Sequence, residues 1–260
     1  MNELISNTKL LRYSDNIYIK LEQDNLSGSI KDRISKLLFN YLTSFNYKKI
    51  VCVSSGNMAI SLLMYNNYYK CGYQIIICSV NLSEFSKKIL ELLGAKLYIF
   101  DTLTSAISFA NNLSKEKDTY YFDQFNNELS VAAYFDLSVE LLKEKIDFDY
   151  IICGIGTGAT LKSLTKIYGL FKPKTKFIGI KPVDKIYGLS KDLDTKIIKS
   201  LSEDIIIKEH CYLDVYTKYK EELLKYPLGF STCASLLEAL NLDCNLKILI
   251  IGTDGYHKYV

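Results

Sequence analysis

Apolar residues along the chain fall into short continuous runs that alternate with longer stretches of helical periodicity. The short runs are rich in Ile and Val, which is typical of strands buried on both faces of a sheet. The pattern predicts strands over residues 16–22, 49–55, 74–80, 96–101, 120–124, 150–155, 176–182 and 247–253. It predicts helices over residues 31–45, 56–69, 83–94, 103–116, 129–145, 159–170, 213–225 and 231–240. Strands that alternate with helices of this length indicate parallel sheets covered by helices on both faces.

The sequence offers no simple cut into consecutive domains. Its 260 residues allow one large α/β domain or two modest ones, and only three of them are proline. There is no Gly/Ser-rich linker and no internal repeat, so any division into domains must be interleaved. In open α/β sheets ligands bind beyond the carboxyl ends of the strands, and we therefore expect the chemistry in turns that follow strands.

Composition and charge argue against several classes of protein. The net charge is only +3 and the lysines are interspersed with acidic residues, so a nucleic-acid partner is not expected. The seven cysteines include no C-x-x-C pair, which indicates reduced thiols rather than disulfides or a zinc site. The only histidines are His210 and His257, so we expect neither a catalytic triad nor a metal. The first residues lack the apolar core of a signal peptide and no apolar run has membrane-spanning length, which predicts a soluble, cytoplasmic protein with no membrane partner.

Two turns after predicted strands carry residues suited to binding anions. The turn "SSGN", Ser54 to Asn57, offers a carboxylate the N–H groups of a helix N-terminus, although the same residues are ordinary helix caps. The turn "GIGTGAT", Gly154 to Thr160, lets a phosphate approach the backbone. It also satisfies the dinucleotide pattern G-x-G-x-x-A, but Lys181 stands where that site needs an acidic residue. A phosphate site is therefore favoured over a dinucleotide site. A third turn, "GTDG" after the last strand, indicates by itself only a turn.

Lys31 lies in the stretch "LSGSIKDRIS", where a turn of small residues leads into a helix. The first turn of a helix favours acidic residues, so a lysine is poorly placed there with respect to the helix dipole. An isolated lysine is most often a solvated surface residue. Here it occurs on a parallel α/β chain together with a phosphate-type turn and a carboxylate-type turn, and this combination favours a functional amine.

These stretches resemble motifs of the cysteine synthase and cystathionine β-synthase family, the fold type II enzymes that depend on pyridoxal 5′-phosphate (PLP). The stretch "KLEQDNLSGSIKDR" is similar to K-L-E-x-x-N-P-G-G-S-V-K-D-R, and "GIGTGAT" to G-[IST]-G-[TS]-G-G-T. Six further stretches resemble family motifs in the same order along the chain: "NTKLLRY", "SSGNMA", "DQF" with Asn126, "GIKP", "KIYGL" and "GFSTCAS". The resemblance extends from about Ile5 to Tyr259 and so covers nearly the whole chain.

The resemblance implies an architecture of two interleaved three-layer α/β domains with mostly parallel sheets, similar to the tryptophan synthase β fold. Residues 36–126 would form a smaller mobile domain. Residues 1–35 and 127–260 would form a larger cofactor-binding domain, with the PLP cofactor in the cleft between the two. Members of the family are usually homodimers, and we carry that expectation over.

The resemblance also implies roles for individual residues. Lys31 would form the Schiff base with PLP and, once displaced by substrate, take the proton from the substrate Cα. Asn57 would bind the ring hydroxyl. The cofactor phosphate would be held by Gly154, Gly156, Thr157, Gly158 and Thr160. The amino-acid substrate would be bound by Ser54, Ser55, Gly56, Met58, Gln124 and Gly188.

Several positions depart from the family pattern. Met58 replaces a threonine that helps to bind the substrate carboxylate, and Ala159 replaces a glycine of the phosphate loop. The segments around Val183 to Lys185 and after Gln124 are shorter than in the family, which trims the rim of the expected active site. Asp254 aligns with the serine that meets the pyridine nitrogen, and Thr253 stands beside it. A hydroxyl from Thr253 would leave the nitrogen unprotonated, whereas Asp254 would favour the protonated ring and a stronger electron sink.

The resemblance predicts β-replacement on an activated L-serine, of the O-acetylserine or O-phosphoserine class, through an aminoacrylate intermediate. A small nucleophile such as sulfide would then give cysteine or a related β-substituted alanine. Elimination, as in a cysteine desulfhydrase or a serine or threonine dehydratase, is the first alternative. A relative that has lost catalysis and serves as a binding or regulatory protein is the second, and a nicotinamide-dependent dehydrogenase is the most distant.

Overall fold

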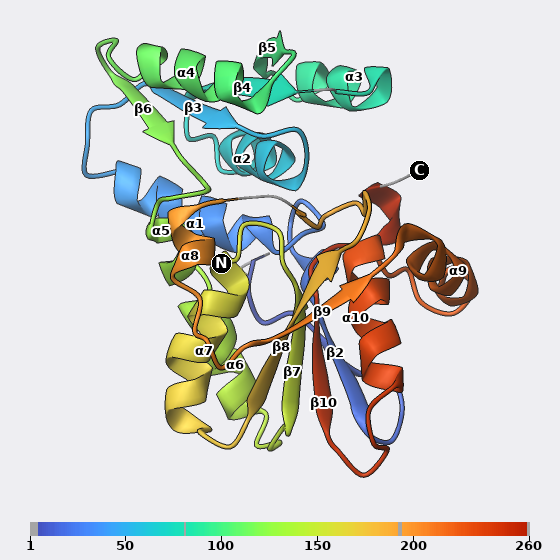
Figure 1. Cartoon of the computed structure of the whole chain (residues 1–260). Coiled ribbons are helices and arrows are strands. Elements are labelled where there is room, and N and C mark those ends of the chain that lie inside the picture. Colours follow the sequence, from blue (N-terminus) through green and yellow to red (C-terminus); the bar gives the residue numbers. More distant parts are fainter. Residues whose placement is uncertain (1–4, 81, 192–193, 259–260) are drawn as a thin grey trace. The chain divides into compact units, whose positions relative to one another are not determined.

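The chain divides into two compact units in the computed structural model, which describes residues 5–80, 82–191 and 194–258. The smaller unit runs from Lys31 to Leu129, and the larger combines the residues up to Ile30 with those from Ser130 onward. Both ends of the chain therefore contribute to the larger unit, and each unit has its own sheet (Figure 1). No helix among the described residues is long and apolar enough to span a membrane.

The larger unit is built on a six-stranded sheet with the strand order β1-β2-β10-β7-β8-β9. Its strands are β1 (Leu10–Arg12), β2 (Ile17–Leu21), β7 (Tyr150–Gly154), β8 (Lys176–Pro182), β9 (Ile206–His210) and β10 (Ile248–Gly252). Only β1 is antiparallel to its neighbour in this sheet. Every residue of β10 is buried, as expected for an apolar run in the middle of a parallel sheet.

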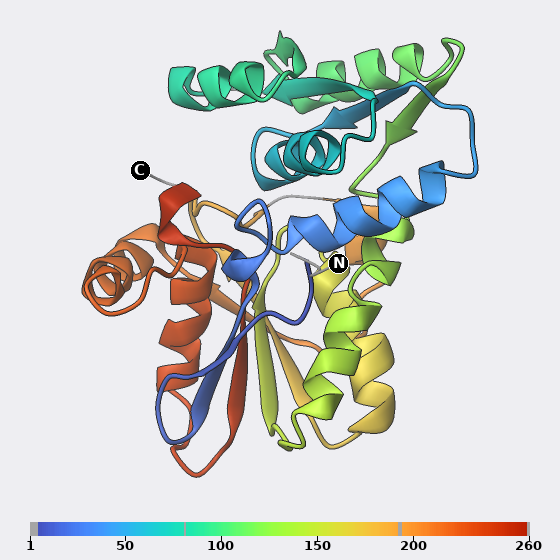
Figure 2. The same ribbon diagram turned by 180° about the vertical axis from the view of Figure 1, so that it is seen from behind.

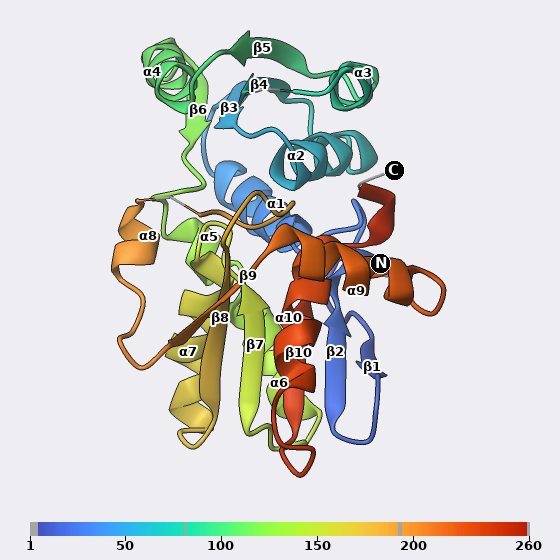
Figure 3. The ribbon, with the colours of Figure 1, turned by 45° about the vertical axis from the view of Figure 1, so that its right-hand side comes forward.

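Helices cover both faces of this sheet. The helices associated with this unit are α5 (Leu129–Ala132), α6 (Phe135–Lys143), α7 (Ala159–Phe171), α8 (Lys196–Lys199), α9 (Tyr212–Leu223) and α10 (Phe230–Leu240), together with the 3₁₀ turns η1 (Glu22–Asp24) and η2 (Tyr256–Lys258). Helices α6 and α7 lie on one face and α10 on the other (Figure 2 and Figure 3). Ile152 and Ile250 of the sheet are buried in one cluster with Val215 of α9 and Ala234 of α10. Their neighbours Ile151 and Leu249 are also fully buried but lie outside this cluster, as expected when successive side chains of a strand point to opposite faces.

The smaller unit has a four-stranded, fully parallel sheet with the strand order β5-β4-β3-β6. The strands are β3 (Lys49–Val53), β4 (Gln74–Val80), β5 (Lys96–Phe100) and β6 (Thr119–Phe122), and the helices are α1 (Lys31–Leu42), α2 (Asn57–Tyr68), α3 (Glu84–Leu92) and α4 (Leu103–Leu113). Ala106 and Ala110 of α4 pack with Val51 of β3 and Ile76 of β4. Small residues on α4 let that helix approach its face of the sheet closely.

The structure confirms the predicted α/β class with mostly parallel sheets, and it differs from the predicted elements in four places. The predicted helix over 129–145 is interrupted between Ala132 and Phe135, at the fully buried Tyr134. The short elements β1 and α8 were not predicted, and neither was β9. Strand β9 lies at the edge of the sheet with four of its five residues exposed, so its sequence IIKEH shows neither a buried run nor a clear alternation.

Candidate active site

A glycine-rich loop joins β7 to α7 in the larger unit, as the sequence predicted. Gly158 caps the helix with φ = +84°, a left-handed conformation that favours glycine. A Cβ atom on Gly156 would lie 3.2 Å from the carbonyl oxygen of Gly188, so this loop also passes close to a second exposed turn. The first N–H groups of α7 have no partner within the helix, and Thr157 and Thr160 add hydroxyl donors. The arrangement suits a phosphate at the positive end of α7.

Ala159 stands where the family has a glycine, and the structure shows why alanine fits. It is the first residue of α7, it is fully buried, and it is not among the residues with positive φ. The only conformational demand for glycine at this point falls on the preceding residue, Gly158. The methyl group therefore packs inside the unit without straining the loop.

A pair of hydroxyl groups lies beside this loop. The Thr253 hydroxyl, just beyond β10, is 2.7 Å from the Ser231 hydroxyl in the first turn of α10. A Cβ atom on Gly154 would lie 3.3 Å from the Cβ atom of Ser231. Thr253 and Ser231 thus stand at the same edge of the sheet as the glycine-rich loop. The stretch "GFSTCAS" was noted in the sequence, but no signal in it singled out the Ser231 hydroxyl.

Asp254 has different surroundings from its neighbour Thr253. It is only 1% exposed, whereas Thr253 is partly exposed. One carboxylate oxygen of Asp254 would lie 2.1 Å from a Cβ atom on Gly229, so the carboxylate lies against the start of α10. Both candidates for the pyridine nitrogen therefore lie near the start of α10, but the Asp254 carboxylate is buried against Gly229, whereas the Thr253 hydroxyl is partly exposed and pairs with Ser231.

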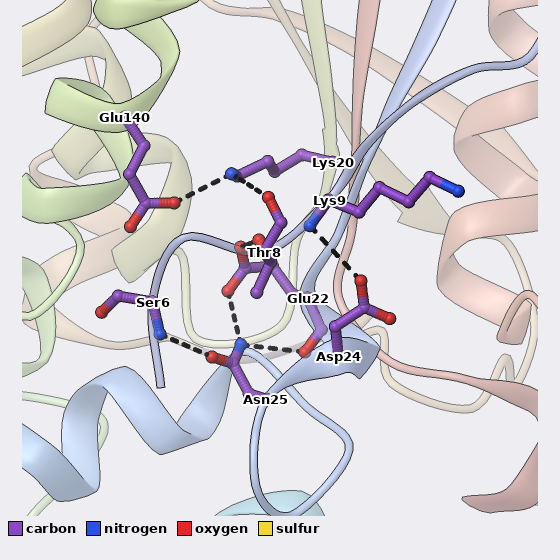
Figure 4. Close-up of polar contacts among 8 residues, drawn as sticks. All are labelled: Ser6, Thr8, Lys9, Lys20, Glu22, Asp24, Asn25 and Glu140. Atoms are coloured by element: carbon purple, nitrogen blue, oxygen red, sulfur yellow. Dashed lines mark hydrogen bonds and ion pairs between the residues drawn. The ribbon is translucent and has the colours of Figure 1, made fainter. Parts of the chain in front are cut away.

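The stretches "NTKLLRY" and "KLEQDN" form one buried polar network in the larger unit (Figure 4). The Thr8 hydroxyl donates to the Glu22 carboxylate at 2.8 Å, and the Asn25 amide donates to the other oxygen of that carboxylate at 2.9 Å. The Ser6 N–H donates to the side-chain oxygen Oδ1 of Asn25 at 3.0 Å. All four residues of this network lie in the segment before Lys31. The network holds the chain where it turns toward α1.

Lys31 begins α1 in the smaller unit and is partly exposed. The next residue, Asp32, is fully buried and accepts a hydrogen bond of 2.5 Å from Ser61 of α2, whose hydroxyl lies 2.7 Å from that of Ser35. Burial is the main cause that raises the pKa of the Cys52 thiol in β3, and the nearby Lys31 charge acts in the opposite direction. The first turn of α1 is therefore fastened to α2, with the Lys31 amine within electrostatic range of β3.

The turn Ser54–Asn57 follows β3 and leads into α2, as predicted. The Ser54 hydroxyl accepts from the Gly56 N–H at 3.3 Å, and a Cβ atom on Gly56 would meet nothing within 4 Å. The Ser55 hydroxyl donates to the Val80 carbonyl oxygen at 3.0 Å, which fastens the turn to β4. Asn57 is the first residue of α2 and is partly exposed. The open side of this turn lies at its glycine.

Gln124 and Met58 complete the predicted site residues of the smaller unit. The Gln124 amide donates to the carbonyl oxygen of Val53 at 2.8 Å, so Gln124 lies at the base of the Ser54–Asn57 turn. Met58 is 1% exposed and packs inside the unit. The smaller unit thus collects Lys31, the serine turn and Gln124, and the larger unit collects the glycine-rich loop, Gly188 and the hydroxyl pair.

Comparison with known proteins gives consistent matches over nearly the whole chain. A cysteine synthase from Aquifex aeolicus is 27% identical to this chain over an alignment of 293 residues including gaps. The alignment covers 99% of this chain and 89% of that protein. The crystal structure of a hydrogen sulfide-producing enzyme from Fusobacterium nucleatum has a TM-score of 0.88 at 26% identity, covering 99% of this chain and 98% of that chain. An O-acetylserine dependent cystathionine beta-synthase from Helicobacter pylori shares the fold, with a TM-score of 0.90 at 21% identity, covering 100% of this chain and 97% of that chain.

These similarities confirm the fold expected from the sequence and the resemblance to cysteine synthases. Residues 2–224 match the protein family described as "Pyridoxal-phosphate dependent enzyme". This match spans far more than half of the 260 residues. The chain therefore belongs to the pyridoxal-phosphate dependent enzymes, and within them it is cysteine synthase-like.

Proposed function

We propose that this enzyme replaces the β-substituent of an activated L-serine, of the O-acetylserine or O-phosphoserine class, with a small nucleophile. The hydroxyl pair of Thr253 and Ser231 beside the glycine-rich loop is the observation that carries this proposal. A neutral hydroxyl at the pyridine nitrogen leaves the ring unprotonated and moderates its electron withdrawal, which favours chemistry at Cβ over transamination or racemisation. The similarity to the cysteine synthase from Aquifex aeolicus, which extends over nearly the whole chain, supports the same reaction class.

The residues of the chain fit PLP. The glycine-rich loop at the N-terminus of α7 offers N–H groups and two hydroxyls to a phosphate, and Thr253 offers a hydroxyl to the ring nitrogen. We assign the ring hydroxyl to Asn57 and the aldehyde to the amine of Lys31. When bound, PLP withdraws electrons from the substrate Cα.

The protein groups then have separable tasks. Lys31 takes the proton from the substrate Cα and later returns it to the product. The turn at Ser54, Ser55 and Gly56 and the Gln124 side chain receive the substrate carboxylate, and the exposed Gly188 contributes backbone beside the loop. Met58 is buried, so we propose that it shapes this turn from inside the unit rather than through a polar contact with the substrate.

The proposed reaction balances without an oxidant or reductant. The bond between Cβ and the leaving oxygen breaks with its electron pair on oxygen, which releases acetate or phosphate. A lone pair of the nucleophile forms the new bond to Cβ, and the nucleophile loses one proton. The net change is substitution at Cβ, and the family resemblance supports a cytoplasmic homodimer as the working form.

Thr253 and Asp254 can be separated by two isosteric variants of the PLP-loaded enzyme. Thr253→Val is expected to shift the absorbance maximum of the cofactor and to lower kcat/KM about two- to tenfold, the effect of one net hydrogen bond. Asp254→Asn is expected to leave the cofactor spectrum unchanged, because this carboxylate lies against Gly229. The assignment is wrong if the Asp254 variant alters the spectrum and the Thr253 variant does not.

Elimination is the second candidate, and the similarity to a hydrogen sulfide-producing enzyme favours it. In the test, the PLP-loaded enzyme is incubated with O-acetylserine or O-phosphoserine, with and without sulfide. The amounts of released acetate or phosphate, of cysteine and of pyruvate are then measured. Replacement predicts that leaving group and cysteine form in equal amounts when sulfide is present, with little pyruvate. Pyruvate equal to the substrate consumed, with or without sulfide, would establish elimination instead.

A further inference from the structure

The C-terminal turn of the described chain covers the glycine turn that precedes Lys31. The Lys258 ammonium donates a hydrogen bond to the carbonyl oxygen of Ser27. The His257 ring lies against Gly28, where a Cβ atom would be 2.3 Å from the ring nitrogen Nε2. The same ring faces Gly255, where a Cβ atom would be 2.9 Å from Nδ1. Two glycines thus make room for one imidazole ring at the surface of the larger unit.

The backbone continues this contact up to the residue before Lys31. Ser29 and Asp254 form an antiparallel bridge, and the Ile30 N–H donates to the carbonyl oxygen of Thr253 at 2.8 Å. Each residue from Ser27 to Ile30 is therefore held by the segment between residues 253 and 258. Lys31 is the next residue along the chain.

The turn that this segment contacts is centred on Gly28. Gly28 has φ = +77°, and its N–H donates to the Asn25 carbonyl oxygen at 2.8 Å, so the turn is tight and left-handed at one point. Partial burial and the adjacent Lys258 charge lower the pKa of His257, so a neutral ring packs against Gly28 at pH 7. The contact therefore places no imidazolium beside the Lys258 ammonium.

We propose that the turn Gly255–Lys258 sets the position of Lys31, with His257 and Lys258 as positioning residues. This inference rests on the proposed role of Lys31 in holding PLP. A reacting amine that is displaced by about 1 Å can lose two orders of magnitude in rate, so a support for its backbone has a measurable effect. Neither residue belongs to the glycine-rich loop Gly154 to Thr160 that we assign to the cofactor phosphate.

The test is a double-mutant cycle read by cofactor binding rather than turnover. The variant H257A/K258A is made in the native chain and in the Lys31→Ala chain, and PLP affinity is measured by titration. Borohydride trapping measures the covalently held fraction in the chains that retain Lys31. We expect the double substitution to weaken PLP binding about tenfold and to lower the trapped fraction when Lys31 is present. In the Lys31→Ala background we expect the affinity to change less than about twofold.

Lys258→Arg is the matched control, because it keeps a donor for the Ser27 carbonyl oxygen, and it is expected to trap PLP as the native chain does. Equal losses of affinity in both backgrounds would overturn the proposal, since a general structural defect acts whether or not Lys31 is present. An unchanged affinity in both backgrounds would overturn it as well. If Lys31→Ala alone left affinity and trapping unchanged, the proposed function itself would fail.

Discussion

Replacing Lys31 with alanine is expected to abolish turnover while leaving the protein folded. Loss of a general base typically costs about 10²- to 10⁴-fold in rate, and Lys31 is also the group we assign to holding the cofactor. The glycine-rich loop at α7 is unaltered in this variant, so PLP should still bind, but through non-covalent contacts alone. Steady-state rates with O-acetylserine and sulfide measure the loss, and the cofactor spectrum before and after borohydride measures the missing covalent bond.

Lys36→Ala is the matched control, because Lys36 is the other lysine of α1. Its rate and its cofactor spectrum are expected to match those of the native chain. Lys31 would not be the catalytic amine if its alanine variant kept native turnover, or if the two variants lost activity to the same extent.

Replacing Glu140 with alanine is expected to lower the free energy of unfolding by about 3–5 kcal/mol, because it leaves a buried ammonium without its carboxylate. The Lys20 amine is 2.9 Å from Glu140, and the two side chains are 1% and 7% exposed. The same amine donates to the Thr8 carbonyl oxygen at 2.5 Å, beside the network in Figure 4. The substitution should therefore also destabilise the segment that leads to Lys31. Urea unfolding of the native protein and of the Glu140→Ala variant measures the difference in the free energy of unfolding.

Two controls separate charge burial from side-chain loss. The double variant K20M/E140L, which replaces the pair by apolar groups of similar size, is expected to be much less destabilised than Glu140→Ala. Asp194→Ala removes the partner of Lys199 in an equally short pair of 2.9 Å whose side chains are 72% and 66% exposed. It should cost less than about 1 kcal/mol. Similar losses for Glu140→Ala and Asp194→Ala would contradict the account.

The strongly patterned parts of the fold were accessible from the sequence. Central strands such as β10 are buried on both faces, so their composition alone identifies them, and the three candidate turns follow β3, β7 and β10 as predicted. Edge strand β9 was missed because, in the part of the chain that the structure describes, one side of its backbone has no partner strand and its exposed residues carry no burial signal. The break before α6 was missed because Tyr134 and its neighbours continue an apolar helical pattern.

The polar contacts of the site were accessible only in part. Motif resemblance singled out Lys31 and the glycine-rich loop, but the link between Thr8 and Glu22 joins residues 14 positions apart, and no local periodicity encodes it. The contrast between Thr253 and Asp254 depends on α10, which packs against β10 only in the folded chain. The same holds for Ala159 and Met58, whose burial is a tertiary property.

The most direct test of the central claim is to locate the cofactor on the chain. The purified protein is loaded with PLP, reduced with borohydride and digested, and the modified peptide is identified by mass spectrometry. The account predicts a phosphopyridoxyl group on Lys31 and on no other lysine in the chain. A label on a different lysine, or a protein that binds no PLP at all, would contradict it.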